Sequence, residues 1–120
     1  MTAKKWCVPD CYYPETTSGG RYPSHESICV LNMGAEDAEI KITLYFEDRE
    51  PMTGLSAVCG ARRTNHIRMD KIKSVSGGTI PRGVPYAALI ESDREVAVQY
   101  SRCDTTQAAL SFLSAVAVTL

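Results

Sequence analysis

The sequence predicts an all-β fold, an antiparallel β-sandwich (jelly-roll-like) of about eight strands. Short apolar segments recur at regular spacing, Pro and Gly lie between them, and one segment alternates apolar and polar residues strictly. With 120 residues the chain is expected to be a single domain, 1–120, that buries about two-thirds of its unfolded surface. An α/β fold would need helices of about 10 to 15 residues between strands. No segment between Glu26 and Arg102 has that pattern.

The N-terminal third contains one weak strand signal and two strong ones. Residues 1–24 are expected to form a loop-rich arm around a short segment at Trp6–Val8, because Pro, Gly, Ser and Thr are frequent and Thr16–Gly20 has turn chemistry. An apolar run with β-branched residues predicts a strand at Ile28–Leu31. At Ala38–Glu47 apolar and polar residues alternate with a period of two, which predicts one face in the core and one in solvent.

Pro and Gly divide the middle of the chain. The polar segment Asp48–Gly54 reads as a turn, because Pro51 cannot donate to a β-ladder. Two strands are then expected, at Leu55–Cys59 and at about Thr64–Met69. Ser76–Gly83 interrupts the chain again.

The C-terminal third is predicted to complete the sandwich. Strands are expected at Tyr86–Ser92 and Glu95–Cys103, joined by a short hairpin loop at Ser92–Arg94. Thr105–Leu110 is compatible with a helix. Phe112–Thr119 is rich in Val, which favours a final strand there.

Charge and hydropathy exclude several classes of protein. The chain has 13 Lys+Arg against 14 Asp+Glu, a formal net charge of -1, so binding to nucleic acid or to an anionic membrane through overall charge is not expected. No apolar run approaches the roughly 18 to 20 residues that span a bilayer, and no secretory signal pattern begins the sequence. We therefore expect a cytoplasmic protein.

The cysteines are expected to be reduced thiols. They number five, they are scattered, and disulfides are rare in the cytosol. The spacing of Cys7 and Cys11 would suit half of a zinc site, but no second closely spaced Cys or His pair completes one. We expect no metal and no structural zinc.

Two polar clusters are candidates for a binding site. The first is Ser24–Glu26 at the start of a strand, and the second is Ala61–Arg68. The arginines of the second cluster would serve equally as a solvated rim that discourages edge-to-edge pairing. Alternatively, their guanidinium groups bind a polyol, a carboxylate or a phosphate through directed hydrogen bonds. Strand geometry places His66 and Arg68 on one face.

Enzymatic alternatives have weaker signals. His25, Glu26 and His66 contain the atoms of a two-His, one-carboxylate metal site of a cupin-like enzyme, but the sequence has no His-x-His. Glu26 and Asp104 would be the paired carboxylates of a carbohydrate-active enzyme, although Asp104 also suits an Asp-initiated turn. No Gly-x-Ser-x-Gly elbow and no phosphate-binding glycine loop occurs. We expect no enzyme, no catalytic residue and no cofactor.

The order of several motifs resembles a known family. Ser24-His25-Glu26 is followed by Glu50-Pro51 and then by Ala61-Arg62-Arg63-Thr64-x-His66-x-Arg68. This order is similar to that of the Anabaena-type sensory rhodopsin transducer family, and the likeness runs from Trp6 to about Thr119. The Cys-rich segment Cys7–Tyr13 and the loop Ser74–Gly78 depart from the family pattern.

The resemblance implies a small soluble antiparallel sandwich that forms a homotetramer and acts as the cytoplasmic partner of a membrane photoreceptor, a sensory rhodopsin. It also implies a non-enzymatic signalling module that binds a small sugar-like or polar anionic ligand. The ligand-binding positions that it suggests are His25, Glu26, Asn32, Arg62, Arg63, His66, Arg68, Arg102 and Asp104.

Overall fold

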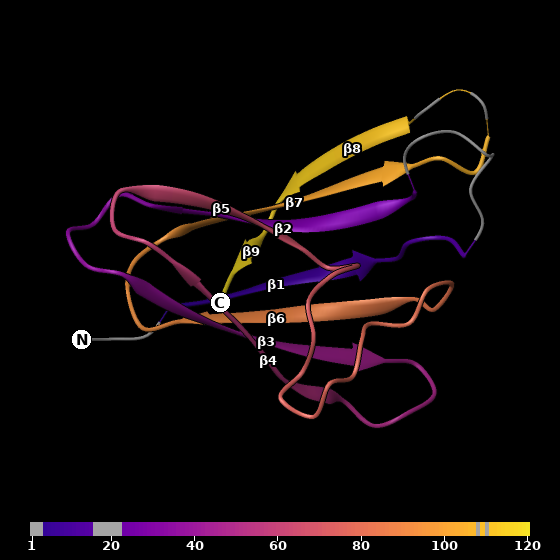
Figure 1. Ribbon diagram of the computed structural model, residues 1–120, viewed down its shortest axis with the longest axis horizontal. Coiled ribbons are helices and arrows are strands. Elements are labelled where there is room, and N and C mark those ends of the chain that lie inside the picture. Colours follow the sequence, from indigo (N-terminus) through magenta and orange to yellow (C-terminus); the bar gives the residue numbers. More distant parts are fainter. Residues whose placement is uncertain (1–3, 16–22, 108, 110) are drawn as a thin grey trace.

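The structure, a computed structural model, describes residues 4–15, 23–107, 109 and 111–120. These residues form nine strands and no helix, in two antiparallel sheets that pack face to face (Figure 1). The predicted all-β sandwich is confirmed. The strands are β1 (Lys4–Cys11), β2 (His25–Asn32), β3 (Ala38–Phe46), β4 (Met52–Cys59), β5 (Arg63–Arg68), β6 (Tyr86–Ser92), β7 (Ala97–Asp104), β8 (Ser111–Val116) and β9 (Val118–Thr119).

The described strands are divided five to four between the sheets. Sheet A has the order β4-β3-β6-β1-β9, and sheet B has the order β5-β2-β7-β8. The predicted final strand is divided at Ala117, so that β8 extends sheet B while β9 pairs with β1 of sheet A. The described residues include no helix that could span a membrane.

Strand β3 has the predicted alternation. Ala38, Ile40, Ile42 and Leu44 are buried, whereas Glu39, Lys41 and Tyr45 are exposed to solvent. The same alternation in β2 directs Glu26, Ile28, Val30 and Asn32 into the space between the sheets. A carboxylate and an amide therefore lie in line with the apolar core residues of this strand.

The connection between β6 and β7 differs from the expected hairpin. Strand β6 pairs with β1 and β3 in sheet A, whereas β7 pairs with β2 and β8 in sheet B. Residues 93–96 therefore cross from one sheet to the other. A period of two identifies the buried face of a strand, but it does not identify the strand that it pairs with.

The N-terminal region contains more strand than expected. Strand β1 covers Lys4–Cys11, whereas the sequence suggested only Trp6–Val8. A register shift between Val8 and Cys11 accommodates Pro9, which cannot donate to the ladder. The turn expected at Thr16–Gly20 lies outside the described residues.

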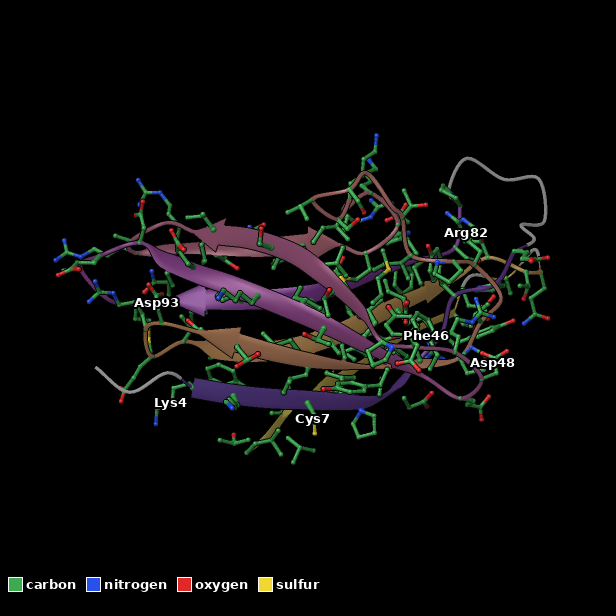
Figure 2. All side chains as sticks on the ribbon, turned by 90° about the horizontal axis from the view of Figure 1, so that it is seen from below. Lys4, Cys7, Phe46, Asp48, Arg82 and Asp93 are labelled. Carbon is green, nitrogen blue, oxygen red and sulfur yellow. The ribbon has the colours of Figure 1, made fainter. Side chains whose placement is uncertain are left out.

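One end of the sandwich concentrates the buried polar groups. Strands β1, β3 and β7 end there and strands β2 and β6 begin there, so that Phe46 pairs with Tyr86. Figure 2 shows Phe46 and Arg82 at this end and Asp93 at the opposite one. Because Glu26 lies just inside it, we call it the Glu26 end.

Candidate functional site

A buried carboxylate lies between the two sheets. Glu26 has no exposed surface. Its Oε1 accepts a hydrogen bond from the Tyr86 hydroxyl at 2.6 Å, and its Oε2 accepts from the main-chain N–H of Tyr12 at 2.7 Å. The Tyr100 hydroxyl also donates to Oε2. Three donors from three separate parts of the chain therefore satisfy this carboxylate, as burial requires.

Arg102 provides the opposite charge. Its Nε lies 3.8 Å from Glu26 Oε2 and donates a hydrogen bond of 3.0 Å to the Tyr100 hydroxyl. Its Nη2 reaches Asp10 Oδ1 at 3.5 Å, and only 15% of the Arg102 side chain is exposed. Arg102 thus connects the buried carboxylate to an acidic group at the surface. We call Glu26, Tyr86, Tyr100 and Arg102, with the Tyr12 amide, the Glu26 centre.

Burial controls the titration of this centre. Loss of solvent raises the pKa of Glu26, and the hydrogen bonds from Tyr86 and Tyr12 and the charge of Arg102 only partly oppose it. Burial, together with the charge of Glu26, also raises the pKa of the Cys11 thiol and of the Tyr86 hydroxyl. The centre therefore holds protons tightly, and the neighbouring Cys11 thiol is not an activated nucleophile.

A groove lies on the surface directly outside the centre. It encloses about 270 Å³. The Phe46 and Tyr86 rings lie 6.3 Å apart at 48°, and Tyr45 is half exposed. Because Tyr86 both lines the groove and donates to Glu26, the groove and the centre share a side chain. We call it the aromatic groove; its lining residues are Pro9, Asp10, Cys11, Tyr45, Phe46, Glu47, Pro85, Tyr86 and Ala87.

A second polar cluster lies around Asp70. Arg68 donates two hydrogen bonds of 2.8 Å to its carboxylate, and Arg82 lies 3.9 Å away. Burial alone would raise the pKa of Asp70, but the hydrogen bonds and charge of Arg68 outweigh it, so the pKa is lowered. The Arg82 guanidinium lies 4.6 Å over the Tyr13 ring and donates to the Ser24 carbonyl at 2.8 Å. This cluster fixes the loops of the Glu26 end.

Among the residues predicted as ligand contacts, Glu26 and Arg102 lie together. His25, Arg68 and Asp104 also lie at the Glu26 end, but the polar contacts of their side chains are with residues two positions away in the sequence. A ring nitrogen of His25, Nδ1, lies 3.0 Å from the Pro23 carbonyl oxygen. The Asp104 carboxylate accepts hydrogen bonds from the Thr106 N–H and hydroxyl at 2.8 Å and 2.7 Å. This is the Asp-initiated turn that the sequence suggested.

Asn32, Arg62 and Arg63 lie at the opposite end. The buried Asn32 amide donates to the main-chain carbonyls of Glu36 and Cys59 at 2.8 Å and 3.0 Å, and so joins the β2–β3 connection to the end of β4. Arg62 has a φ of 54° and is exposed, and Arg63 Nη1 donates to the Arg62 carbonyl at 3.0 Å. The nine predicted positions therefore do not form one site.

The structure separates the groups of the metal and carbohydrate alternatives. His66 faces solvent on sheet B, whereas Glu26 faces the core, so that these two cannot ligate one ion with His25. Across residues 4–15, 23–107, 109 and 111–120, no group of three or more His, Cys, Asp or Glu lies close enough to hold a metal. Asp104 is half-buried in its turn and bonded to Thr106, while Glu26 is fully enclosed, which does not suit paired carboxylates around one substrate bond.

Sequence reasoning missed several residues of the site. Tyr86 and Tyr100 occupy inward positions of β6 and β7, where an aromatic residue suggests only core packing. Asp70 and Arg82 lie in the long connection after β5. One signal was present: a Glu at an inward position of an apolar strand requires buried donors, and tyrosines on neighbouring strands are the available ones.

Comparison with known proteins identifies the family. The family model for the Anabaena sensory rhodopsin transducer matches residues 1–119. A crystal structure of Thermotoga maritima 1070 is similar, with a TM-score of 0.82 and 33% identity over 95% of this chain and 91% of that one. The structure of the Anabaena sensory rhodopsin transducer is also similar, with a TM-score of 0.71 and 33% identity over 81% and 84% of the two chains. No curated protein matches. The chain therefore belongs to the Anabaena sensory rhodopsin transducer family.

Proposed function

We propose that this protein is a non-enzymatic signalling module that binds a small sugar-like ligand in the aromatic groove. One observation carries the proposal. Tyr86 forms part of the groove wall and also donates a hydrogen bond of 2.6 Å to the buried Glu26. Occupation of the groove is therefore linked to a buried charged group, as a ligand-responsive transducer requires.

The chemistry of the groove favours a neutral, hydroxylated ligand. Tyr45, Phe46 and Tyr86 supply aromatic surface, and Asp10 and Glu47 supply carboxylates that accept hydrogen bonds from hydroxyl groups. The two carboxylates would repel an anion. Of the sugar-like and anionic ligands expected from the sequence, the sugar-like class therefore fits this groove better.

Asp10 offers a path from the ligand to the centre. Its Oδ1 lies 3.5 Å from Arg102 Nη2, a weak contact at the surface. A ligand hydroxyl bound to Asp10 would compete with Arg102, which would then pair more closely with Glu26. Arg102 lies on β7 of sheet B and Asp10 on β1 of sheet A, so the response would involve both sheets.

A thermal-shift screen tests ligand binding. Sugars, polyols, sugar acids and phosphates are each added to the purified protein. A ligand at 100 times its Kd stabilises the fold by about 2.7 kcal/mol, a shift of several degrees in Tm for a domain of this size. We expect neutral sugars or polyols to give the shift, and sugar acids and phosphates to give less.

Variants locate the site. Tyr45→Ala and Glu47→Gln should each abolish the shift, because both side chains line the groove. Glu50→Gln is the matched control, since Glu50 is exposed in the same loop but does not line the groove. Absence of any shift across the panel, or a shift that survives both groove variants, would overturn the proposal.

Strand β8 supports assembly with further copies, as expected for a homotetramer. All six of its residues are exposed, and Phe112, Leu113 and Val116 are 73%, 47% and 82% exposed. It forms one edge of sheet B, at the margin of the molecule in Figure 1. The sequence from Thr105 to Leu120 contains no charged residue. An uncharged apolar edge strand of this kind pairs readily with another strand.

Membership of the family supports a sensory rhodopsin, a membrane photoreceptor, as the partner, and the cytoplasm as the location. The test is a titration of the purified protein with a detergent-solubilised sensory rhodopsin, monitored by calorimetry. Saturable binding is expected. Heats no larger than those of a titration with detergent micelles alone would remove this part of the proposal.

A further inference from the structure

The outer face of sheet B brings a thiol and an imidazole side by side. The register of β2 and β5 pairs Cys29 directly with His66, and the register of β2 and β7 pairs Cys29 with Gln99. Directly opposed side chains on one face have Cβ atoms about 4.5–5.5 Å apart. All three residues line a shallow hollow of about 340 Å³ that is open to solvent. This hollow is separate from the aromatic groove.

We propose that Cys29 is a reactive thiol, assisted by His66, that forms a mixed disulfide with a low-molecular-weight disulfide. A neutral imidazole nitrogen accepts the proton of the Cys29 thiol. The thiolate attacks one sulfur of the disulfide, the sulfur–sulfur bond of that molecule breaks, and a new bond to Cys29 Sγ forms. The displaced thiolate takes the proton from the imidazolium. One disulfide is consumed, and one mixed disulfide and one thiol are produced.

The surroundings of Cys29 favour this step. The thiol is half-buried, and its Sγ lies 3.8 Å from the Ser101 hydroxyl, which can donate a hydrogen bond to a thiolate. Among the described residues opposite or diagonal to Cys29 on β5 and β7, none is a carboxylate: they are Thr64, His66, Arg68, Ala97, Gln99 and Ser101. The one charged side chain among them, Arg68, is positive and is paired with Asp70. No negative side chain at these opposed and diagonal positions disfavours the thiolate.

The chain contains its own control. Cys7 is also half-buried, but it lies on the outer face of sheet A, where it pairs with Leu89 of β6 and Val118 of β9. Neither of these directly opposed neighbours can accept a proton, and the diagonal neighbour Glu91 is paired with Lys5. Figure 2 shows the Cys7 side chain directed away from the body of the molecule. The other three cysteines, Cys11, Cys59 and Cys103, are buried.

The test compares the two accessible thiols. Oxidised glutathione is added at about pH 7, and the adducts are followed by intact mass and located by peptide mapping. In the unmodified chain we expect Cys29 to react about tenfold faster than Cys7. The single variants Cys7→Ser and Cys29→Ser confirm the assignment, since each leaves one accessible thiol.

Histidine variants test the role of the imidazole. His66→Gln should reduce the rate at Cys29 to about that of Cys7 and leave the rate at Cys7 unchanged. His25→Gln is the matched control, because His25 pairs with Cys103 at the end of β2 and not with Cys29. A Cys29 rate no greater than that of Cys7 in the unmodified chain, or a rate unaffected by His66→Gln, would overturn the proposal.

Discussion

Glu26 makes the stability of the protein depend on pH. Its pKa in the folded state is raised above the ordinary 4.5, chiefly by burial. Below the ordinary pKa both the folded and the unfolded chain hold the proton on Glu26, and the contribution of this proton to the stability of the fold is fully present. As the pH rises toward the raised value, only the unfolded chain releases the proton, so the free energy of unfolding falls by at most about 1.4 kcal/mol per pH unit.

The variant Glu26→Gln should remove this dependence, because the amide does not titrate. We expect urea unfolding from about pH 4 to about pH 8 to show the unmodified chain losing stability relative to the variant as the pH rises. Parallel curves for the two proteins would contradict the prediction. Other titrating groups are common to both chains and cancel in the difference.

Asp70 should have the opposite dependence. Its pKa is lowered in the folded state, so its contribution is present above the ordinary value of 3.8 and is lost as the pH falls through the lowered one. Asp70→Asn should cost about 2 kcal/mol at neutral pH, because Arg68 loses its two-point partner. Asp48→Asn is the control: Asp48 also pairs with an arginine, but at the surface, and no measurable change is expected.

Individual residues of the candidate site could be predicted only in part. Glu26 was found in the polar cluster Ser24–Glu26, and Arg102 was found through the resemblance to the family. Tyr86 and Tyr100 were not, because an inward-facing tyrosine has the same sequence pattern whether its hydroxyl binds a carboxylate or a carbonyl. Asp104 shows the reverse case, since its turn explains it without any ligand.

At the scale of elements, Asn32 joins the β2–β3 connection to the end of β4. Its amide donates to two carbonyls, and its Oδ1 accepts the N–H of Gly34 at 2.9 Å. Asn32→Ala should therefore cost about 3 kcal/mol in the free energy of unfolding, because buried main-chain groups lose their partners. Asn65→Ala removes a single bond, to the Val58 carbonyl, at a more exposed position. Equal losses in denaturant unfolding would contradict a special role for Asn32.

The elements themselves were largely predictable. The alternation at Ala38–Glu47 identified β3 and its buried face, because a half-buried strand must alternate. The pairing of β6 and β7 with different sheets was not predictable in this way. Ser92–Arg94 has the composition of a hairpin turn, and composition does not distinguish a turn within a sheet from a crossing between sheets.

At the scale of the whole molecule, the proposed assembly through β8 predicts how copies would meet. Antiparallel pairing of two β8 strands about a two-fold axis at Ser114 would join two B sheets into one. On the outer face each Phe112 would then lie opposite Val116 of the other copy, and the two Ser114 side chains would face each other. Pairs of aromatic and β-branched residues stabilise neighbouring strands, so the sequence of β8 suits pairing with itself.

Ser114→Lys tests this arrangement, because it would place two like charges opposite each other at the two-fold axis. Ser114 is exposed in the single chain, so the fold should tolerate the change. We expect sedimentation equilibrium to show that the association between copies of the variant is at least tenfold weaker than that of the unmodified chain. The largest assembly of the variant should be a dimer that forms through a surface other than β8. Thr53→Lys is the matched control, since Thr53 is exposed on β4, the far edge strand of sheet A. If Ser114→Lys associates as the unmodified chain does, β8 does not form the contact between copies.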